Sequence, residues 1–271
     1  MTTSDQLKGY AYPSPKGISS LVGDMPWHYC TEHLDIVFKA DPKAIASFLP
    51  EPLHPGENPD RVILSFGKWW SLWESGLDLP AVNPERTWYM ETILWVGSSF
   101  EGRQGRTCIQ SWVDNDFTMA RGMYMGFNKK LGKTVMTDLQ PMNPKMAAIE
   151  AGTRLSGYTV SHGERLFEGS VTLKEEIPYE ELPDPILKNP FNIRYFPSVV
   201  RGAPPSVFEL VGIHMGDFKN SKTAWVGDAT VKLLPSVLEE YMVFEPREVL
   251  GGYYFFNGAS YYGGEVLHSW V

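Results

Sequence analysis

Residues 87–115, TWYMETILWVGSSFEGRQGRTCIQSWVDN, decide the fold class of this chain. Residues 87–100 and 107–115 are rich in the β-branched and aromatic side chains that strands favour. The segment EGRQGR between them is polar and contains two glycines, which suits the turn of a hairpin. The sequence therefore predicts two long antiparallel strands near its centre.

Strand-like stretches continue on both sides of this hairpin. They cover residues 34–38, 61–70, 153–161, 166–175, 191–199, 206–218, 223–234 and 248–256. His162-Gly163 suits the turn of a second hairpin, and Asn257-Gly258 indicates a tight turn between aromatic runs. Two segments carry helix signals: one begins at Asp41-Pro42, and the other covers residues 116–126 with Asp116 as its cap.

The helices are too few and too irregular for repeated βαβ units, which argues against a doubly wound parallel sheet. From the pattern alone we expect a mostly antiparallel β-domain, built as a barrel or a sandwich, that carries a few short helices. Residues 1–25 are rich in Gly, Pro and Ser and are interpreted as an N-terminal arm.

The composition limits the classes of partner. The chain has 24 basic and 32 acidic side chains and a formal net charge of −8. This balance argues against binding to nucleic acid or to anionic membranes, both of which attract a basic surface. No apolar run approaches the ~18–20 residues that span a bilayer, and the N-terminus lacks the apolar region of a secretory signal. Because two cysteines do not make a disulfide framework, we expect a cytoplasmic protein.

Two groups of residues have competing interpretations. Residues 28–33, HYCTEH, contain two His, one Cys and one Glu. Alternate residues of a strand point to opposite faces, so these side chains do not all converge, and no metal site is expected. The chain also has nine Trp, thirteen Tyr and fourteen Phe residues. Rings near residues 69–73 and 253–262 either pack in the core or line a ligand cavity.

The sharpest local feature is FNKKLG, residues 127–132, in which Lys129 and Lys130 follow an apolar segment. Adjacent lysines at a helix end are ordinarily solvated surface residues. Apolar surroundings or a second cation, however, lower the pKa of a lysine amine, and the neutral amine can attack a ketone to form an imine. The imine withdraws electrons, so the neighbouring carbon can lose CO2 or a proton. Adjacent strand residues point to opposite faces, which leaves open whether Lys130 faces Lys129.

With these residues the sequence resembles the acetoacetate decarboxylase family. Its Lys-Lys-Leu-Gly run is similar to the family's motif, which implies that Lys129 forms the Schiff base and that Lys130 is its neighbour. Glu91 has the spacing of the family's Tyr-x-Glu and takes the role of the active-site acid. Residues 34–53, LDIVFKADPKAIASFLPEPL, and the approach to the lysines over residues 112–122 are similar as well.

The resemblance covers about residues 20–260 and implies an α+β fold around a mostly antiparallel β-barrel or cone, in one domain over residues 1–271. It implies no cofactor and no metal, because the imine is itself the electron sink. It also implies a small keto acid or ketone as the partner and a homo-oligomer as the assembly.

The sequence departs from the family at the polar end of the substrate. The family's arginine aligns with Thr31, and Val62-Ile63-Leu64 stands where an acidic partner is expected. Losing both members of a charged pair leaves neither buried alone, and it indicates a less polar pocket and a substrate other than acetoacetate. We take Arg121 as a replacement cation, and Arg121, Thr31 and Trp73 as candidate substrate-binding residues.

Three functions are compatible with the sequence. The first is a Schiff-base lyase that decarboxylates a β-keto acid through an imine on Lys129. The second is an aldolase-dehydratase, or a cyclising dehydratase, that uses the same imine on 2-oxo acids. The third is a non-catalytic β-domain that binds a hydrophobic ligand. An imine trapped on Lys129 would distinguish the first two from the third.

Overall fold

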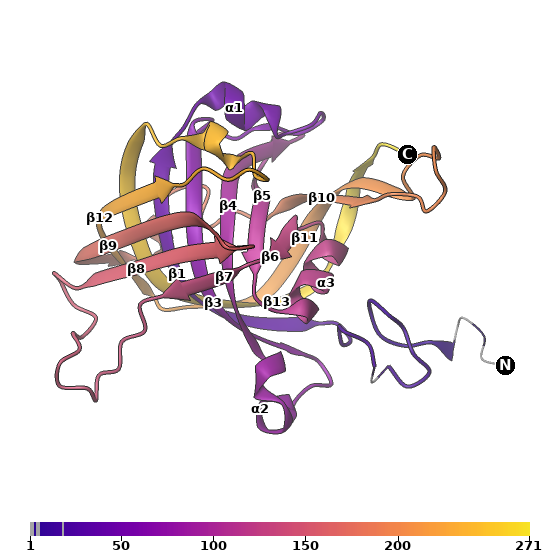
Figure 1. Cartoon of the computed structure of the whole chain (residues 1–271), viewed down its shortest axis with the longest axis horizontal. Coiled ribbons are helices and arrows are strands. Elements are labelled where there is room, and N and C mark those ends of the chain that lie inside the picture. Colours follow the sequence, from indigo (N-terminus) through magenta and orange to yellow (C-terminus); the bar gives the residue numbers. More distant parts are fainter. Residues whose placement is uncertain (1–2, 4–5, 18) are drawn as a thin grey trace.

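The computed structural model describes residues 3, 6–17 and 19–271 (Figure 1). Its strands are β1 (Trp27–Lys39), β2 (His54–Pro55), β3 (Arg61–Trp73), β4 (Trp88–Phe100), β5 (Arg103–Val113), β6 (Lys129–Leu131), β7 (Lys133–Met136), β8 (Arg154–Ser161), β9 (Glu164–Pro178), β10 (Phe191–Phe196), β11 (Val207–Asn220), β12 (Thr223–Leu233) and β13 (Glu248–Ser269). The α-helices are α1 (Pro42–Ser47), α2 (Leu79–Val82) and α3 (Asp116–Met125), and the 3-10 helices are η2 (Pro84–Arg86), η3 (Tyr179–Glu181) and η4 (Tyr241–Phe244).

These strands form one 13-stranded sheet, whose main path runs β6-β5-β4-β3-β1-β13-β12-β9-β8-β7. Off this path, β10 pairs with β11, β11 with β13, and β2 with β4. Among the described strands, the one parallel pairing joins β5 to β6. The expected α+β class with a mostly antiparallel sheet is therefore confirmed. The pairings leave β6 and β7 as the two ends of the path and do not themselves close it into a barrel or cone.

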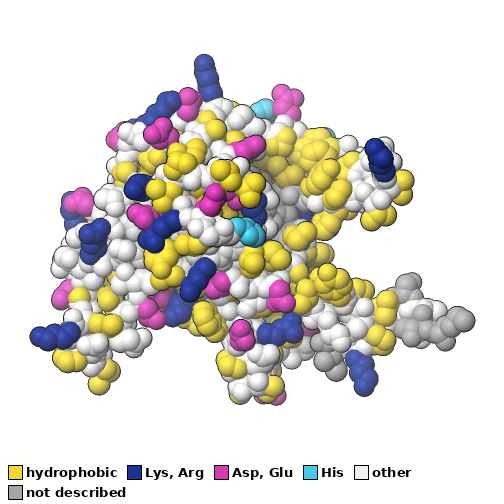
Figure 2. All heavy atoms as spheres, viewed as in Figure 1, with side chains coloured by type: hydrophobic (Ala, Val, Ile, Leu, Met, Phe, Trp, Pro, Cys, Tyr) yellow, Lys and Arg dark blue, Asp and Glu magenta, His cyan; other side chains and the backbone are white. Residues whose placement is uncertain are grey.

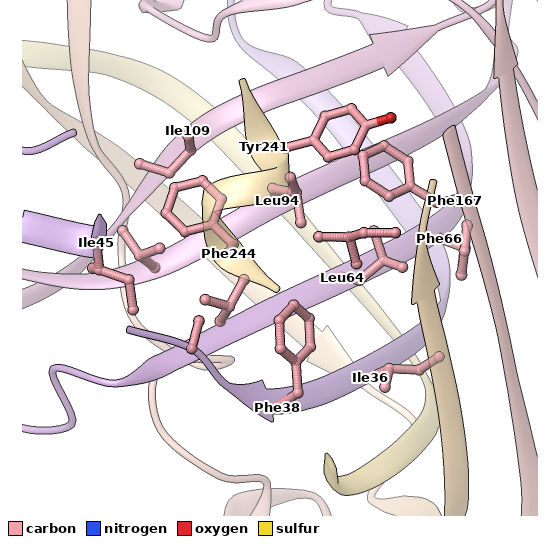
Figure 3. Packing of buried hydrophobic residues seen from close by; sticks show 14 of the residues in the cluster. Ile36, Phe38, Ile45, Leu64, Phe66, Leu94, Ile109, Phe167, Tyr241 and Phe244 are labelled. Carbon is pink, nitrogen blue, oxygen red and sulfur yellow. The ribbon is translucent and has the colours of Figure 1, made fainter. Parts of the chain in front are cut away.

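The sheet folds back on itself, so that β7, β8 and β9 cross in front of β1, β3 and β4 (Figure 1). The main hydrophobic core packs between these halves. Phe66 of β3 presses so closely against β8 and β9 that a Cβ on Gly157 would lie 2.7 Å from its ring, and one on Gly169 would lie 3.0 Å away. Figure 3 labels residues of this core, among them Ile36, Phe38, Leu64, Leu94, Phe167, Tyr241 and Phe244.

Strand β1 shows how one strand serves both faces of the sheet. Ile36 and Phe38 are fully buried in the main core. Thr31, His33 and Asp35 alternate with the core residues and therefore point to the opposite face, since successive strand side chains point to opposite sides. They too are buried, because this face is covered by other parts of the chain.

Most predicted elements are present at nearly the predicted positions. The central hairpin is β4–β5, and the second hairpin is β8–β9. Asp41 caps α1 and accepts a 2.9 Å hydrogen bond from the backbone N–H of Lys43. Helix α3 is also where it was predicted, but its N-cap is Asn115, which accepts from the backbone N–H of Phe117, rather than Asp116.

The predicted tight turn at Asn257-Gly258 is wrong. Both residues lie inside β13, with Asn257 opposite Thr31 of β1 on one side and opposite Asn220 of β11 on the other. Hydrogen bonding to a strand on each side fixes an extended backbone here, and this tertiary pairing overrides the local preference for a turn.

The predicted N-terminal arm, residues 1–25, is only partly described, because residues 1–2, 4–5 and 18 lie outside the described part of the chain. Within the remainder, Tyr10 packs edge-on against Trp27 with ring centroids 5.6 Å apart, and against Tyr124 at 5.3 Å. None of the helices in the described part is long and apolar enough to cross a membrane.

Hydrophobic side chains gather on the surface over the β10–β11 part of the molecule, at the upper right of Figure 2. Tyr195, Val200 and Val266 are more than half exposed in this region. Exposed apolar patches of this kind are commonly covered by another chain. The homo-oligomer expected from the sequence stays a prediction.

Candidate active site

A cavity of about 420 Å³ lies on the face of the sheet that points away from the main core. Strands β1, β3, β4, β5 and β13 contribute lining residues from the sheet, and α3, β11 and residues 179–190 contribute them from the covering side. Lys129, Glu91, Arg121 and Thr31, all predicted from the sequence, line this cavity together. Lys130 and Trp73, the other two predicted site residues, are not among its lining.

Lys129 enters the cavity from β6, which pairs in parallel with β5 and places Lys129 beside Ser111. Its side chain is only 6% exposed, and that of Glu91 on β4 is 2% exposed. Nζ of Lys129 lies 3.0 Å from Oε1 of Glu91 and donates a 2.9 Å hydrogen bond to Oγ1 of Thr118. Ser111 Oγ donates a 2.5 Å hydrogen bond to the same Glu91 oxygen. Amine and carboxylate are thus held against each other with little access for water.

A glycine on α3 gives the Lys129 side chain its space. A Cβ on Gly122 would lie 2.3 Å from Cδ and 2.5 Å from Cε of Lys129, far inside van der Waals contact. Gly126 then ends α3 with φ of 78°, a left-handed conformation that glycine adopts without strain. The chain turns there toward β6, which brings Lys129 back under the helix that covers it.

Burial lowers the pKa of Lys129, because the ammonium form loses its hydration. The Glu91 carboxylate raises this pKa, and the positive charge of Arg121 lowers it. Lys130 points to the other face of β6, where its Nζ lies 2.5 Å from Oε2 of Glu239. The second cation near the Lys129 amine is therefore Arg121 rather than the adjacent lysine.

Arg121 is a buried cation, 3% exposed, that reaches the cavity from α3. It donates a 3.2 Å hydrogen bond to Oγ of Ser71, and its guanidinium carbon lies 4.8 Å from the ring centre of Tyr29 and 5.4 Å from that of Phe117. Among the described residues it forms no ion pair. Burying a charge without a counter-charge is costly, so this end of the cavity favours an anionic ligand.

Aromatic rings form much of the cavity wall. Trp69 stacks in parallel on Tyr89, with ring centroids 5.9 Å apart, and Trp95 lies farther along β4. Such walls keep the dielectric low, which strengthens every electrostatic effect on the amine. Trp73 packs instead beside the N-terminal arm, where a Cβ on Gly23 would lie 2.3 Å from its ring.

The amine of Lys129 is the candidate nucleophile of this site. Burial raises the pKa of the nearby Cys108 thiol to about 12, which keeps it protonated and unreactive at neutral pH. In the described part of the chain, no three His, Cys, Asp or Glu side chains are grouped so that they could hold a metal ion.

The structure adds residues that sequence reasoning did not assign to this site. They are Ser111, Thr118, His33, Arg106, Tyr179 and Asn257. His33 was considered only as a metal ligand, and Asn257 only as part of a turn. The alternation along β1 was the available signal, because it puts His33 on the same face as Thr31. Thr118 and Tyr179 depend on tertiary contacts that a single sequence does not show.

Comparison with known proteins agrees with this geometry. Residues 10–270 match the family model described as acetoacetate decarboxylase. The chain belongs to the acetoacetate decarboxylase family. It is 23% identical over 231 residues to acetoacetate decarboxylase 1 of Bradyrhizobium diazoefficiens, a match that covers 83% of this chain and 79% of that protein.

Two solved structures are similar to this family member over nearly its whole length. One is the enduracididine biosynthesis enzyme MppR complexed with the condensation product of pyruvate and imidazole 4-carboxaldehyde, with a TM-score of 0.90, 27% identity and 98% of each chain covered. The other is an acetoacetate decarboxylase-like enzyme from Sphingomonas wittichii RW1, with a TM-score of 0.89 and 25% identity over 97% of this chain and 100% of that one. The resemblance inferred from the sequence is confirmed.

Gly122→Ala should prevent Lys129 from reacting with ketones while the fold is kept. Alanine is favoured over glycine in a helix by about 1 kcal/mol, so α3 itself is not weakened, but the new methyl group occupies the space of the lysine side chain. The measurement is borohydride trapping with acetone, followed by peptide mass mapping and thermal unfolding. Gly97→Ala is the matched control, because its Cβ would meet nothing closer than 3.7 Å. Equal trapping by both variants would contradict this account.

Glu91→Gln should move the acid limb of imine formation to lower pH. Attack requires the neutral amine, so trapping increases as the pH rises through the pKa of Lys129. Glu91 raises that pKa, and removing its charge therefore lowers it. The measurement is the pH profile of adduct formation with acetone, an uncharged ketone. Lys130→Met is the control. The acid limb of its pH profile should stay at the wild-type position, since Lys130 pairs with Glu239 on the other face of β6. A limb that moves to higher pH in Glu91→Gln would disprove the assignment.

Proposed function

We propose that this protein is an imine-forming lyase that acts on a small keto acid through Lys129. The observation that carries the proposal is the placement, in one cavity, of a buried amine and a buried cation that forms no ion pair with any described residue. Nζ of Lys129 lies 5.3 Å from the ring centre of Tyr89, and the guanidinium carbon of Arg121 lies 5.8 Å from the same centre. A molecule that carries both a ketone and a carboxylate fits two such groups.

The proposed chemistry begins with attack of the neutral Lys129 amine on the ketone carbon. Water leaves the resulting carbinolamine, and a protonated imine remains. Glu91, 3.0 Å from Nζ, is placed to accept and return protons during these steps, and Thr118 holds the amine through its hydroxyl group. Arg121 binds the carboxylate, and Thr31 contributes to the cavity wall. Lys130 and Trp73 lie outside the cavity lining and make no contact with the substrate in this mechanism.

The carboxylate site favours a 2-oxo acid over a β-keto acid. In a decarboxylation the carboxylate becomes neutral CO2, so a cation that binds it stabilises the ground state more than the transition state. A 2-oxo acid keeps its carboxylate while C3 loses a proton to give an enamine, and Arg121 then stays paired throughout. The enamine can form a carbon–carbon bond with an aldehyde, and loss of water and hydrolysis of the imine release the product. MppR, seen with a condensation product of pyruvate, is consistent with this chemistry.

Decarboxylation of a β-keto acid is the second candidate. The observation that favours it is the match to acetoacetate decarboxylase 1 over most of both chains. In this reaction the bond between the imine's α-carbon and the carboxylate breaks, CO2 leaves, and the electron pair enters the imine as an enamine. A proton then returns to the carbon before hydrolysis frees Lys129.

Incubation with pyruvate or acetoacetate and borohydride should label Lys129, because reduction converts the imine into a stable amine. Peptide mass mapping locates the label, and Lys129→Ala should lose it. Carbon–carbon bond formation from pyruvate and an aldehyde identifies the first reaction, and CO2 release from β-keto acids identifies the second. If no keto acid or ketone labels the wild-type protein, the imine is wrong and a non-catalytic binder is left.

Arg121→Gln should weaken the binding of pyruvate far more than the binding of acetone. Removing one partner of a buried charge pair typically costs about 2 kcal/mol or more, so the half-saturating pyruvate concentration should rise about 30-fold or more. The ratio between the two ligands is the readout, because a change in the pKa of Lys129 affects both equally. Lys219→Gln, which removes an exposed cation at the cavity, is the matched control and should change the ratio little. An unchanged ratio in Arg121→Gln would rule out Arg121 as the carboxylate site.

A further inference from the structure

The cavity continues well beyond the Lys129–Glu91 pair. Glu91 of β4 lies opposite Gly67 of β3, which in turn lies opposite His33 of β1. Neighbouring strands are about 4.8 Å apart, so His33 stands about 10 Å from Glu91 across the sheet. The cavity between them is large for a three-carbon or four-carbon acid alone, since pockets of about 300–1,000 Å³ hold much larger ligands. The distant part of the cavity therefore has room for more of a substrate.

Gly67 has no side chain, and the indole of Trp69 covers its position. A Cβ on Gly67 would lie 2.5 Å from Nε1 of Trp69. Stacking on Tyr89 fixes this ring, and the ring of His33 meets it edge-on with centroids 5.7 Å apart. The indole N–H forms no hydrogen bond with any other described residue. It is therefore a free donor on the cavity floor between Glu91 and His33.

A chain of polar contacts ends in a second free donor. Nδ1 of His33 lies 3.7 Å from Oδ1 of Asp35, and Nε2 of His33 lies 3.2 Å from Oδ1 of Asn257. Nδ2 of Asn257 donates a 3.0 Å hydrogen bond to the hydroxyl oxygen of Tyr179. The Tyr179 hydroxyl thus accepts a bond, while its own proton has no acceptor among the described residues. Burial raises the pKa of Tyr179, so this proton is kept at neutral pH.

The charge at this end of the cavity is balanced. The guanidinium of Arg106 lies 4.2 Å from the ring centre of Trp95 and donates a 2.7 Å hydrogen bond to the carbonyl of Ile186. Its Nε is buried without a partner among the described residues. Burial lowers the pKa of Arg106, and the carboxylate of Asp35 opposes this effect. The positive charge of Arg106 therefore has the buried Asp35 carboxylate nearby.

We propose that Trp69, Tyr179 and Arg106 form a distal subsite that binds an uncharged, hydrogen-bond-accepting oxygen of the substrate. Trp69 and Tyr179 direct free donors into the cavity, and Nε of Arg106 is buried without a partner among the described residues, which is costly. A carbonyl, ether or hydroxyl oxygen supplies an acceptor for such donors. A second carboxylate is disfavoured, because the buried carboxylate of Asp35 at this end would repel it. This inference rests on the proposed function, since it describes the far end of the keto acid that reacts at Lys129. The substrate class is a monoanionic 2-oxo acid whose chain, or whose condensation partner, carries a neutral oxygen.

The test compares two 2-oxo acids of equal length in the full-length protein. 5-Methoxy-2-oxopentanoate carries an ether oxygen where 2-oxoheptanoate has a methylene group, and 2-oxoadipate ends in a second carboxylate. Half-saturating concentrations for borohydride labelling of Lys129 should favour the methoxy compound over 2-oxoheptanoate by about fivefold, as expected for one net hydrogen bond. The preference should fall to about one in Tyr179→Phe and in Trp69→Phe. It should persist in Tyr195→Phe, a matched loss of a hydroxyl outside the cavity.

Several results would overturn the subsite. One is equal labelling of the wild type by the methoxy compound and 2-oxoheptanoate. Another is a preference for the methoxy compound that survives in both Tyr179→Phe and Trp69→Phe. The third is a lower half-saturating concentration for 2-oxoadipate than for either of the other two acids. If neither these acids nor pyruvate label Lys129, the imine chemistry of the proposed function is wrong. Calorimetric titration of the wild-type protein with the same two acids then decides the distal subsite without any covalent step.

Discussion

The burial of the Lys129 amine against the Glu91 carboxylate is the constraint on which the rest of the site depends. Taking an ammonium group out of water is costly, and the Glu91 charge and the Thr118 hydroxyl offset that cost. If Glu91 and Thr118 offset the cost fully, the amine would stay protonated and could not attack a ketone. Burial and the positive charge of Arg121 oppose them, because both lower the pKa of Lys129. The site is thus a balance of opposing effects on one proton, set by side chains from β4, β6 and α3.

The same strands build the hydrophobic core and hold this balance. Ile36 packs in the core, while Thr31 and His33 of the same strand line the cavity. A one-residue slip in register would exchange the two faces and would destroy the core and the site together. The buried polar cavity therefore gains its rigidity from the apolar face behind it. The glycines at positions 67 and 122 then provide space on the polar face, where Trp69 and Lys129 lie.

The local sequence pattern was sufficient to predict secondary structure and the alternation of side chains along a strand. Strand composition and turn residues predicted the β4–β5 and β8–β9 hairpins, and alternation explains why Lys130 faces away from Lys129. Glu91 beside Lys129 came from the family resemblance, since nothing in the spacing of two residues on different strands shows their contact. Asn257 was misread because its neighbours on β1 and β11 are remote in sequence. Trp73 was proposed for the cavity on aromatic character alone, which does not distinguish a cavity wall from packing against the N-terminal arm.

The distribution of charge gives the cavity a direction. Arg121 donates to Ser71 but forms no ion pair with any described residue, whereas Arg106 has the buried Asp35 carboxylate nearby. A single negative charge is therefore best placed at the Arg121 end. In the proposed binding mode, a keto acid held there by its carboxylate presents the adjacent carbonyl carbon toward Lys129, and the rest of its chain extends over Trp69. The sequence comparison predicted the loss of the family's charged pair at Thr31 and Val62-Ile63-Leu64. That prediction is compatible with the proposed orientation, in which the anchoring cation comes from α3 instead of the first strand. In the proposed mechanism, orientation of the substrate and activation of the amine share one residue. Arg121 attracts the carboxylate, and its positive charge also lowers the pKa of Lys129.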